Sequence, residues 1–424
     1  MRLTPYITLL RHNPDFTRLY LAQLASFAGD WFATVALLGL ALEMTGSSAL
    51  ASVVLALQTG GFAAAAPFAG TVADRIDRRR LLVAVDLARM PVALAFLLAR
   101  DPETLWIAFV AVLFLAVGAA FFEPTSSASL PNLVAPDDLP AANVLIGSAW
   151  GTMLAIGAAL GGLVAVTLGR EAAFVINAAS FGVSALLILG IRRALQLPRE
   201  QTAHRAAVVG LGDAILTAVR FARPRRTVAA FLLTKTSFGI GTGIVALLAV
   251  FGRNVFGGGD AGIGVLFAAR GLGALVGPFL ARSVMGTDDR GLIRGIAWSF
   301  VVLTVAYAIF PLAPGLAAAA VLVFIAHCGG GAQWALSTLG LQRSTPDAIR
   351  GRVFSVDYGL VTLVIALSTL LAGVLADVAP PRVAAWTMVA LVAAAGAAWY
   401  QFSRPALAGA SAPGQSVDLP AEDR

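Results

Sequence analysis

One carboxylate stands in the middle of the first long apolar segment of the chain, at Asp30. A charge at the centre of a membrane helix costs at least about 2.5–3.5 kcal/mol, so such a residue faces a water-filled cavity or is protonated. Three further side chains share its helical face and indicate a stripe that lines a cavity: Gln23, Phe27 and Thr34. We interpret Asp30 as an acid that carries a proton or recognises a cationic substrate. The alternative is a structural acid paired with a neighbouring helix.

Two cations lie deep in apolar segments of the second half of the chain, Lys235 and Arg270. Each is a candidate partner for Asp30 or for an anionic group on a substrate. Lys235 shares a helical face with Phe238. It also lies near enough to the start of its segment for its long stem to reach the inner membrane surface instead.

Other polar and aromatic residues fall on the faces expected to surround the same cavity. Glu123 and Asp357 lie near inner ends of apolar segments, and we interpret them as gating or interface residues rather than substrate ligands. The remaining candidates for the cavity wall are Phe114, Phe121, His327 and Trp334. Aromatic stripes also arise from simple helix packing. As cavity walls they predict an apolar pocket with few charges, which suits amphipathic organic molecules.

The sequence lacks the usual side-chain sets of catalytic and metal sites. Cys328 is the only cysteine, and the three histidines are far apart in sequence. There is no Ser-His-Asp arrangement, and the glycine run at 257–259 has no following lysine to form a nucleotide-binding loop. We therefore expect no enzyme, no metal site and no cofactor.

Composition places these residues in a membrane. The chain has 424 residues, of which 58% are hydrophobic and only 12% are charged, and its mean hydropathy is +0.84. A soluble domain carries about 25% charged residues. Lipid offers no partners to backbone amides, so the spans are expected to be helices. The net charge of +7 comes from arginines at the ends of the spans, which indicates contact with lipid headgroups and not with nucleic acid.

The apolar segments predict an all-α polytopic protein with twelve transmembrane helices in two pseudo-symmetric six-helix bundles. With the N-terminus inside, 24 of the 30 basic residues fall on the inner side and four on the outer side. Both termini are thus predicted in the cytoplasm, in the plasma membrane of a bacterium. The predicted spans are 16–43, 48–73, 81–99, 104–124, 141–168, 171–190, 228–252, 261–282, 291–310, 315–339, 353–377 and 382–402.

Matching motifs at a nearly constant offset indicate that the two halves are repeats. Pro67-Phe68 matches Pro278-Phe279, and Pro136-Asp137 matches Pro346-Asp347. At the first of these offsets Asp77 also matches Asp288. Two repeats with a site between them at the bilayer midplane is a transporter design. Because one chain supplies both halves, we predict a monomer.

The predicted domains are a first bundle at 1–190, a cytoplasmic linker at 191–226, a second bundle at 227–402 and a disordered tail at 403–424. In the linker, four residues share a helical face, which suggests a helix in the inner headgroup layer. These residues are Leu211, Ile215, Ala218 and Ala222. A plain cationic linker is the alternative.

Two short motifs resemble those of the major facilitator superfamily. The loop after the second span reads Gly-Thr-Val-Ala-Asp-Arg-Ile-Asp-Arg-Arg-Arg and is similar to the cytoplasmic latch of that family. The resemblance assigns gating to Gly70, Asp74 and Arg75, with Arg79 as flanking charge. In the fifth span, Gly157, Gly161 and Gly162 resemble the antiporter motif of drug exporters, although Ala158 replaces its proline.

The segments 132–143 and 350–355, together with Gln23 and Asp30, resemble the macrolide-efflux and enterobactin-exporter branch. This resemblance implies export of small molecules driven by protons. Many drug:proton antiporters carry a coupling arginine in the fourth span, but residues 113–118 contain none. The equivalent latch of the second half, at 281–290, is degenerate.

The leading hypothesis is therefore proton-coupled export of amphipathic drug-like compounds or secondary metabolites. The alternatives are an exporter of one specific siderophore or metabolite, and an uptake permease. The expected partners are the small-molecule substrate, protons and membrane lipids.

Overall fold

The computed structural model describes residues 4–196, 211–284, 286 and 288–409, and these residues are almost entirely helical. Within these described residues, twelve helical spans are long and apolar enough to cross a membrane, which confirms the predicted fold class and number of spans. We call the end of each helix that is predicted to face away from the cytoplasm its outer end.

The first bundle begins with a short helix that the sequence analysis did not predict, α1 (Thr4–His12). It continues with α2 (Pro14–Thr45), α3 (Ser48–Arg75), α4 (Arg78–Leu94) with the short turn η1 (Ala95–Leu98), α5 (Leu105–Leu133), α6 (Leu139–Thr167) and α7 (Arg170–Leu189). The fourth span is longer than predicted: α5 passes through Pro124 and ends at Leu133 rather than at residue 124.

The second bundle follows the linker helix α8 (Leu211–Ala222). Its first span is broken into α9 (Arg226–Gly241), α10 (Ile244–Val250) and the π-helical turn η3 (Phe251–Val255). The others are α11 (Gly259–Val284), α12 (Asp289–Ile309) with η4 (Phe310–Leu312), α13 (Leu316–Ser344), α14 (Asp347–Val378) and α15 (Pro381–Gly409). The last helix thus continues beyond the predicted end at residue 402. The rest of the predicted tail lies outside the described residues.

An aspartate caps the N-terminus of equivalent helices in the two halves. Asp77 precedes α4 and accepts a hydrogen bond from the amide of Arg80 at 2.9 Å. Asp288 precedes α12 and accepts one from the amide of Gly291 at 3.3 Å. Each carboxylate satisfies an amide that the helix itself leaves unpaired. The matching motifs in the sequence therefore mark equivalent structural positions.

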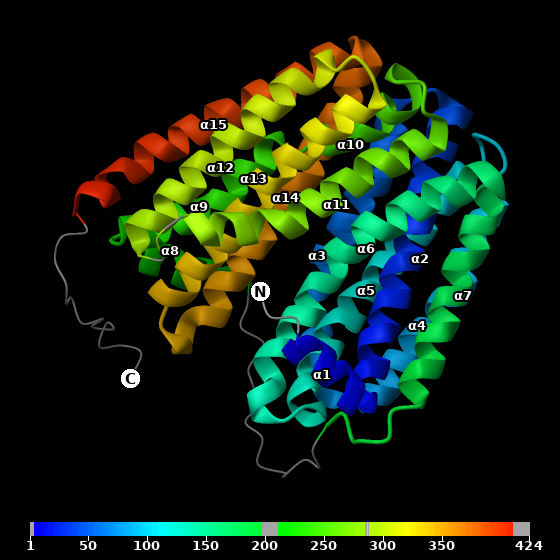
Figure 1. Ribbon diagram of the computed structural model, residues 1–424, viewed down its shortest axis with the longest axis horizontal. Coiled ribbons are helices and arrows are strands. Elements are labelled where there is room, and N and C mark those ends of the chain that lie inside the picture. The colour runs from blue at the N-terminus through cyan, green and yellow to red at the C-terminus, as the bar shows by residue number, and fades with distance from the viewer. Residues whose placement is uncertain (1–3, 197–210, 285, 287, 410–424) are drawn as a thin grey trace.

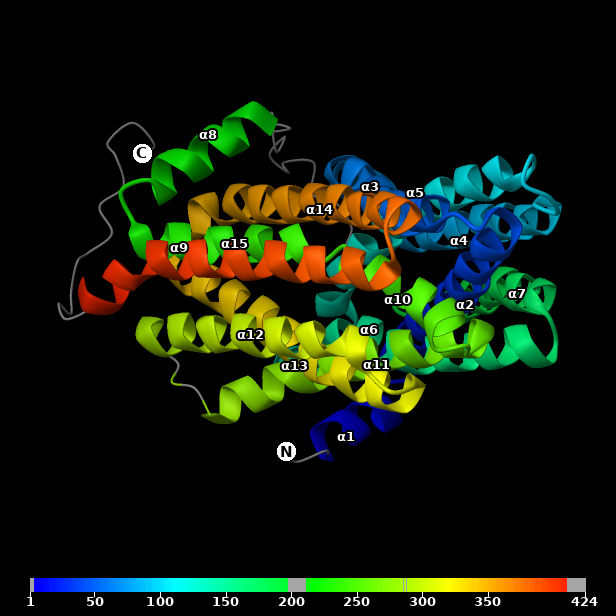
Figure 2. The same ribbon diagram turned by 90° about the horizontal axis from the view of Figure 1, so that it is seen from above.

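The two bundles meet along two helix pairs, α6 with α11 and α3 with α14, as Figures 1 and 2 show. Polar contacts join the bundles at their outer ends. The Asp377 carboxylate of α14 accepts hydrogen bonds from Ser47 and from the first amides of α3. Arg170 of α7 binds Asp260 of α11 at 2.6 Å. In Figure 1 the outer ends converge, whereas α1 lies apart from α8 at the inner side.

The glycines of the antiporter-like stretch let α6 approach helices on both of its sides. A Cβ at Gly161 would lie 2.8 Å from the Phe32 Cα atom of α2. A Cβ at Gly162 would lie 2.8 Å from the Asp260 carbonyl oxygen of α11. Gly157 packs in the same way against Trp31. Small residues thus bring the two bundles into backbone contact.

The linker contains the predicted helix, but its buried face differs from the predicted one. Ala214, Ala218 and Ala222 are buried, and α8 packs against α14. Ile215 is 43% exposed. The buried face therefore shares Ala218 and Ala222 with the predicted one and is rotated from it by roughly 30°. Placement of α8 in the headgroup layer remains a prediction.

We predict that Gly162→Val destabilises the protein, because the added side chain must push α6 away from the α11 backbone. Overpacking of this kind costs about 1–3 kcal/mol. Thermal unfolding in detergent measures the effect. Gly147→Val is the matched control on the same helix, because a Cβ at Gly147 meets nothing within 4 Å. Equal melting temperatures for the two variants would contradict the close-packing role.

Candidate functional site

The partner of Asp30 is an arginine on the third span, Arg89 of α4. Its Nη2 atom lies 2.7 Å from the Asp30 carboxylate, and its Nη1 atom donates to Ser26 Oγ at 2.9 Å. The guanidinium carbon also lies 4.0 Å from the centre of the Phe181 ring on α7. Two other helices of the first bundle, α2 and α7, therefore hold this cation. Neither Lys235 nor Arg270 pairs with Asp30.

Arg89 lies within the predicted third span, although the orientation predicted from the sequence places it with the basic residues of the inner side. The sequence feature that could have identified Arg89 as a site residue is an acid and an arginine three residues apart in an apolar helix, Asp86 and Arg89. Arg89 also packs against the fourth span, because a Cβ at Gly118 would lie 2.8 Å from its Cδ atom. The third span thus brings an arginine to the fourth, where residues 113–118 have none.

Two more carboxyl groups surround this arginine. Asp86 is fully buried, and its Oδ1 atom lies 3.8 Å from Arg89 Nη1. Glu123 on α5 is close enough to interact electrostatically with both Arg89 and Asp30. The side chain of Asp30 is 26% exposed, whereas that of Arg89 is 4% exposed. Asp30 is therefore the more exposed member of the pair.

The stripe beside Asp30 packs against neighbouring helices. The side-chain oxygen Oε1 of Gln23 accepts a hydrogen bond from Ser126 of α5 at 3.1 Å, and Phe27 is buried. Thr34 accepts from Gln58 of α3 at 2.7 Å and donates to the Asp30 carbonyl. The stripe thus joins α2 to α3 and α5.

The two phenylalanines of α5, Phe114 and Phe121, share one side of that helix. Phe114 is 60% exposed. Nine residues separate it from Glu123, which puts the two on opposite sides of α5. Phe121 lies close to the same side as Phe114, seven positions along the helix. Both rings lie near the side of α5 on which Gly118 packs against Arg89. Their place in the cavity wall remains a prediction.

Lys235 of α9 forms an ion pair with Asp357 of α14. The two side chains are 1% and 0% exposed, so Lys235 does not extend to the membrane surface. The ammonium lies 5.3 Å from the centre of the Trp334 ring, which in turn meets Tyr358 edge-on. The sequence analysis assigned Lys235 to the cavity and Asp357 to the gate. The structure makes them one buried pair in the second bundle.

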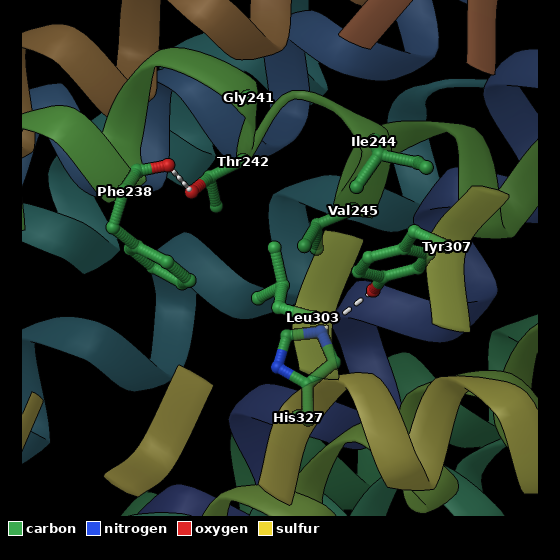
Figure 3. A pocket seen from close by; sticks show the side chains of 8 residues that line it. All are labelled: Phe238, Gly241, Thr242, Ile244, Val245, Leu303, Tyr307 and His327. Atoms are coloured by element: carbon green, nitrogen blue, oxygen red, sulfur yellow. Dashed lines mark hydrogen bonds between the residues drawn. The ribbon is translucent and has the colours of Figure 1, made fainter. Parts of the chain in front are cut away.

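A small pocket opens where the seventh span is broken between α9 and α10 (Figure 3). The break falls at Gly241-Thr242-Gly243, and Ser368 repairs it by accepting from the Gly243 amide and donating to the Ile240 carbonyl. His327 and Tyr307 point toward one another across the pocket and share a 2.7 Å hydrogen bond. The lining residues are Phe238, Gly241, Thr242, Ile244, Val245, Leu303, Tyr307 and His327.

Arg270 lies on α11 where the two bundles meet. Its guanidinium carbon is 5.7 Å from the Trp150 ring centre and 5.8 Å from the Phe267 ring centre. Trp31 of α2 contacts both of these rings, at 6.1 and 5.9 Å between centres. The cluster therefore contains two residues from each bundle.

The cytoplasmic loop after α3 is tied to the first bundle. Arg79 donates to the Arg193 carbonyl at 2.8 Å, and Arg78 donates to the Ala128 carbonyl at 2.6 Å. Arg75 is exposed at the end of α3. The predicted gate residue Asp74 has its side chain outside the described part, and Gly70 is described only as part of α3. Gating by this loop remains a prediction.

Comparisons with known proteins give the family. A model of the family described as transmembrane secretion effector matches residues 6–422. The proposed bacilysin exporters BacE of Bacillus subtilis and Bacillus amyloliquefaciens are each 27% identical over 367 residues, which is 85% of this chain and 88% of the relative.

Solved transporters share the fold. An inward-facing, unoccupied bacterial homologue of the human lysosomal transporter Spinster has a TM-score of 0.72 and 16% identity, covering 94% of this chain and 98% of that one. The nucleoside transporter NupG has a TM-score of 0.66 and 14% identity, covering 92% and 98%.

For the Lys235–Asp357 pair we predict a double-mutant cycle with strong coupling. Lys235→Met or Asp357→Leu alone leaves one buried charge unpaired, which costs about 3–5 kcal/mol. The double variant removes both charges, so its loss of stability should be smaller than that of either single variant. Thermal unfolding in detergent checks this order. Additive losses would show that the pair does not couple.

Proposed function

Because the chain belongs to the transmembrane secretion effector family of the major facilitator superfamily, we propose that it exports amphipathic small molecules by proton antiport. The membership makes it a secondary transporter. Direction, coupling ion and substrate class are our inferences. The proposal places the protein in the cytoplasmic membrane of a bacterium, with both termini inside.

The observation that carries the proton coupling is the Asp30–Arg89 pair. Its acid is partly exposed, its cation is buried, and a second carboxylate, Asp86, lies 3.8 Å from the same guanidinium. A proton on Asp30 would remove the charge that holds Arg89 on one side. Arg89 would then be attracted toward Asp86. Arg89 would thus have two alternative partners, Asp30 and Asp86, and the protonation of Asp30 would decide between them, as a switch requires.

The outer contacts support a cycle of alternating access. Asp377 caps α3, and the Arg170–Asp260 pair joins α7 to α11, so the bundles are held together at the outer side. Glu43 of α2 and Arg253 beside α10 extend this network. For export, these contacts must break while the inner ends come together. The Asp30 switch would bias the protein between the two arrangements.

Proton entry supplies enough free energy for such a cycle. One charge moving through 100 mV yields about 2.3 kcal/mol. One pH unit adds about 1.4 kcal/mol. Together these support a concentration ratio of several hundred for an uncharged solute exchanged for one proton.

Export is favoured over uptake by the curated relatives, which are proposed exporters of the metabolite bacilysin. The same relatives favour a metabolite over a broad range of drugs. The apolar rings of Trp31, Trp150 and Phe267 at the junction of the bundles support an amphipathic cargo. An exporter of one defined metabolite is thus the second candidate.

We predict that Asp30→Asn abolishes proton-driven export, because an amide cannot exchange a proton. The measurement is dye retention in energised cells that express each variant at equal levels, with the cationic dye rhodamine 6G and the carboxylate dye fluorescein. Wild type should lower the retention of at least one dye, and a protonophore should remove this effect.

Asp213→Asn is the control, because Asp213 is exposed on the linker helix α8. It should behave as wild type. Undiminished export by Asp30→Asn, or export that survives the protonophore, would refute coupling through Asp30.

A further inference from the structure

Three cations lie deep in the described spans, and they differ in whether a carboxylate pairs with them. Arg89 has Asp30 at 2.7 Å, and Lys235 has the Asp357 carboxylate. Arg270 has no carboxylate or other hydrogen-bond acceptor in range among the described residues. A charge within a membrane helix is normally paired, because an unpaired one is costly. No described residue supplies a counter-charge to Arg270.

The surroundings of Arg270 fit one end of a small amphipathic anion. The ring centres of Trp150 and Phe267 lie 5.7 and 5.8 Å from the guanidinium carbon, and Trp31 extends this apolar surface. The titratable groups that interact with Arg270 are Tyr307 and His327, which hydrogen-bond to one another. Neither of them brings a negative charge at neutral pH.

Arg270 also occupies the place where a ligand would affect both bundles. It lies near the middle of α11, and the rings around it come from α2, α6 and α11. Ligand sites of two-repeat transporters lie at this interface, near the bilayer midplane. A guanidinium matches the planar geometry of a carboxylate with two parallel hydrogen bonds.

We propose that Arg270, with Trp31, Trp150 and Phe267, binds the carboxylate end of the transported solute. This inference rests on the proposed export function and narrows its substrate class to amphipathic carboxylates. The apolar part of the solute packs against the three rings. The carboxylate completes the pairing of Arg270.

Binding to the purified full-length protein in maltoside detergent tests the proposal without any gradient. The probes are three molecules of nearly equal shape: indole-3-acetate, its neutral amide and the cation tryptamine. The panel also contains an aliphatic carboxylate with its amide and the corresponding amine, and a dipeptide with its C-terminal amide. Carboxylates should raise the melting temperature of wild type by several degrees, and their amides should not.

Arg270→Gln should remove this preference, and Arg270→Lys should keep part of it. Arg282→Gln is the matched control, because Arg282 is exposed in the last turn of the same helix. Without ligand, Arg270→Gln should melt no lower than wild type, since it removes an unpaired charge. A lower melting temperature without ligand would indicate a structural role and overturn the proposal.

The other outcomes are equally decisive. A panel in which no carboxylate binds better than its amide overturns the proposal. Displacement of the carboxylates by phosphatidylglycerol in mixed micelles also overturns the proposal, because the occupant of the site would then be a lipid headgroup. Selective binding together with failed dye export would contradict proton-coupled export alone. Intact proton-driven export without Arg270-dependent selectivity would contradict the carboxylate site alone.

Discussion

The cost of holding a charge where water is scarce governs this structure. The apolar spans leave few places for ionised side chains, so each deep charge must find a counter-charge or reach a cavity. Arg89 and Lys235 meet carboxylates on other helices of their own bundles. At the outer end, Arg170 and Asp260 meet across the two bundles. Pairs within a bundle stabilise it, whereas pairs between bundles hold one conformation of the transporter.

The two bundles use their buried pairs in different ways. The Lys235–Asp357 pair is sealed, with both side chains almost fully buried. In the Asp30–Arg89 pair the acid is partly exposed, whereas the arginine is buried. This difference is what we expect if the Lys235–Asp357 pair stabilises the fold and the Asp30–Arg89 pair changes during transport. Arg270, which has no carboxylate partner among the described residues, lies at the junction where α6 and α11 approach through glycine.

Hydropathy was enough to predict the spans, because bilayer thickness fixes how long an apolar helix must be. It did not predict the continuation of α5 beyond Pro124, since the extra turns lie outside the apolar stretch. Asp30 was predictable, because an acid in an apolar helix is conspicuous. Its partner was not, since 59 residues separate it from Arg89 and only packing brings the two together. The same holds for Lys235 and Asp357, which are 122 residues apart.

The most direct test of this account measures whether Asp30 sets the conformation of the two bundles. Spin labels at Ile76 and Val284, both exposed near inner ends, report the distance between the bundles in lipid nanodiscs. In wild type, the distance distribution should shift as the pH is lowered, and in Asp30→Asn it should stay fixed in one arrangement at every pH. A pH-dependent shift that persists in Asp30→Asn would contradict the account, because another group would then control the exchange.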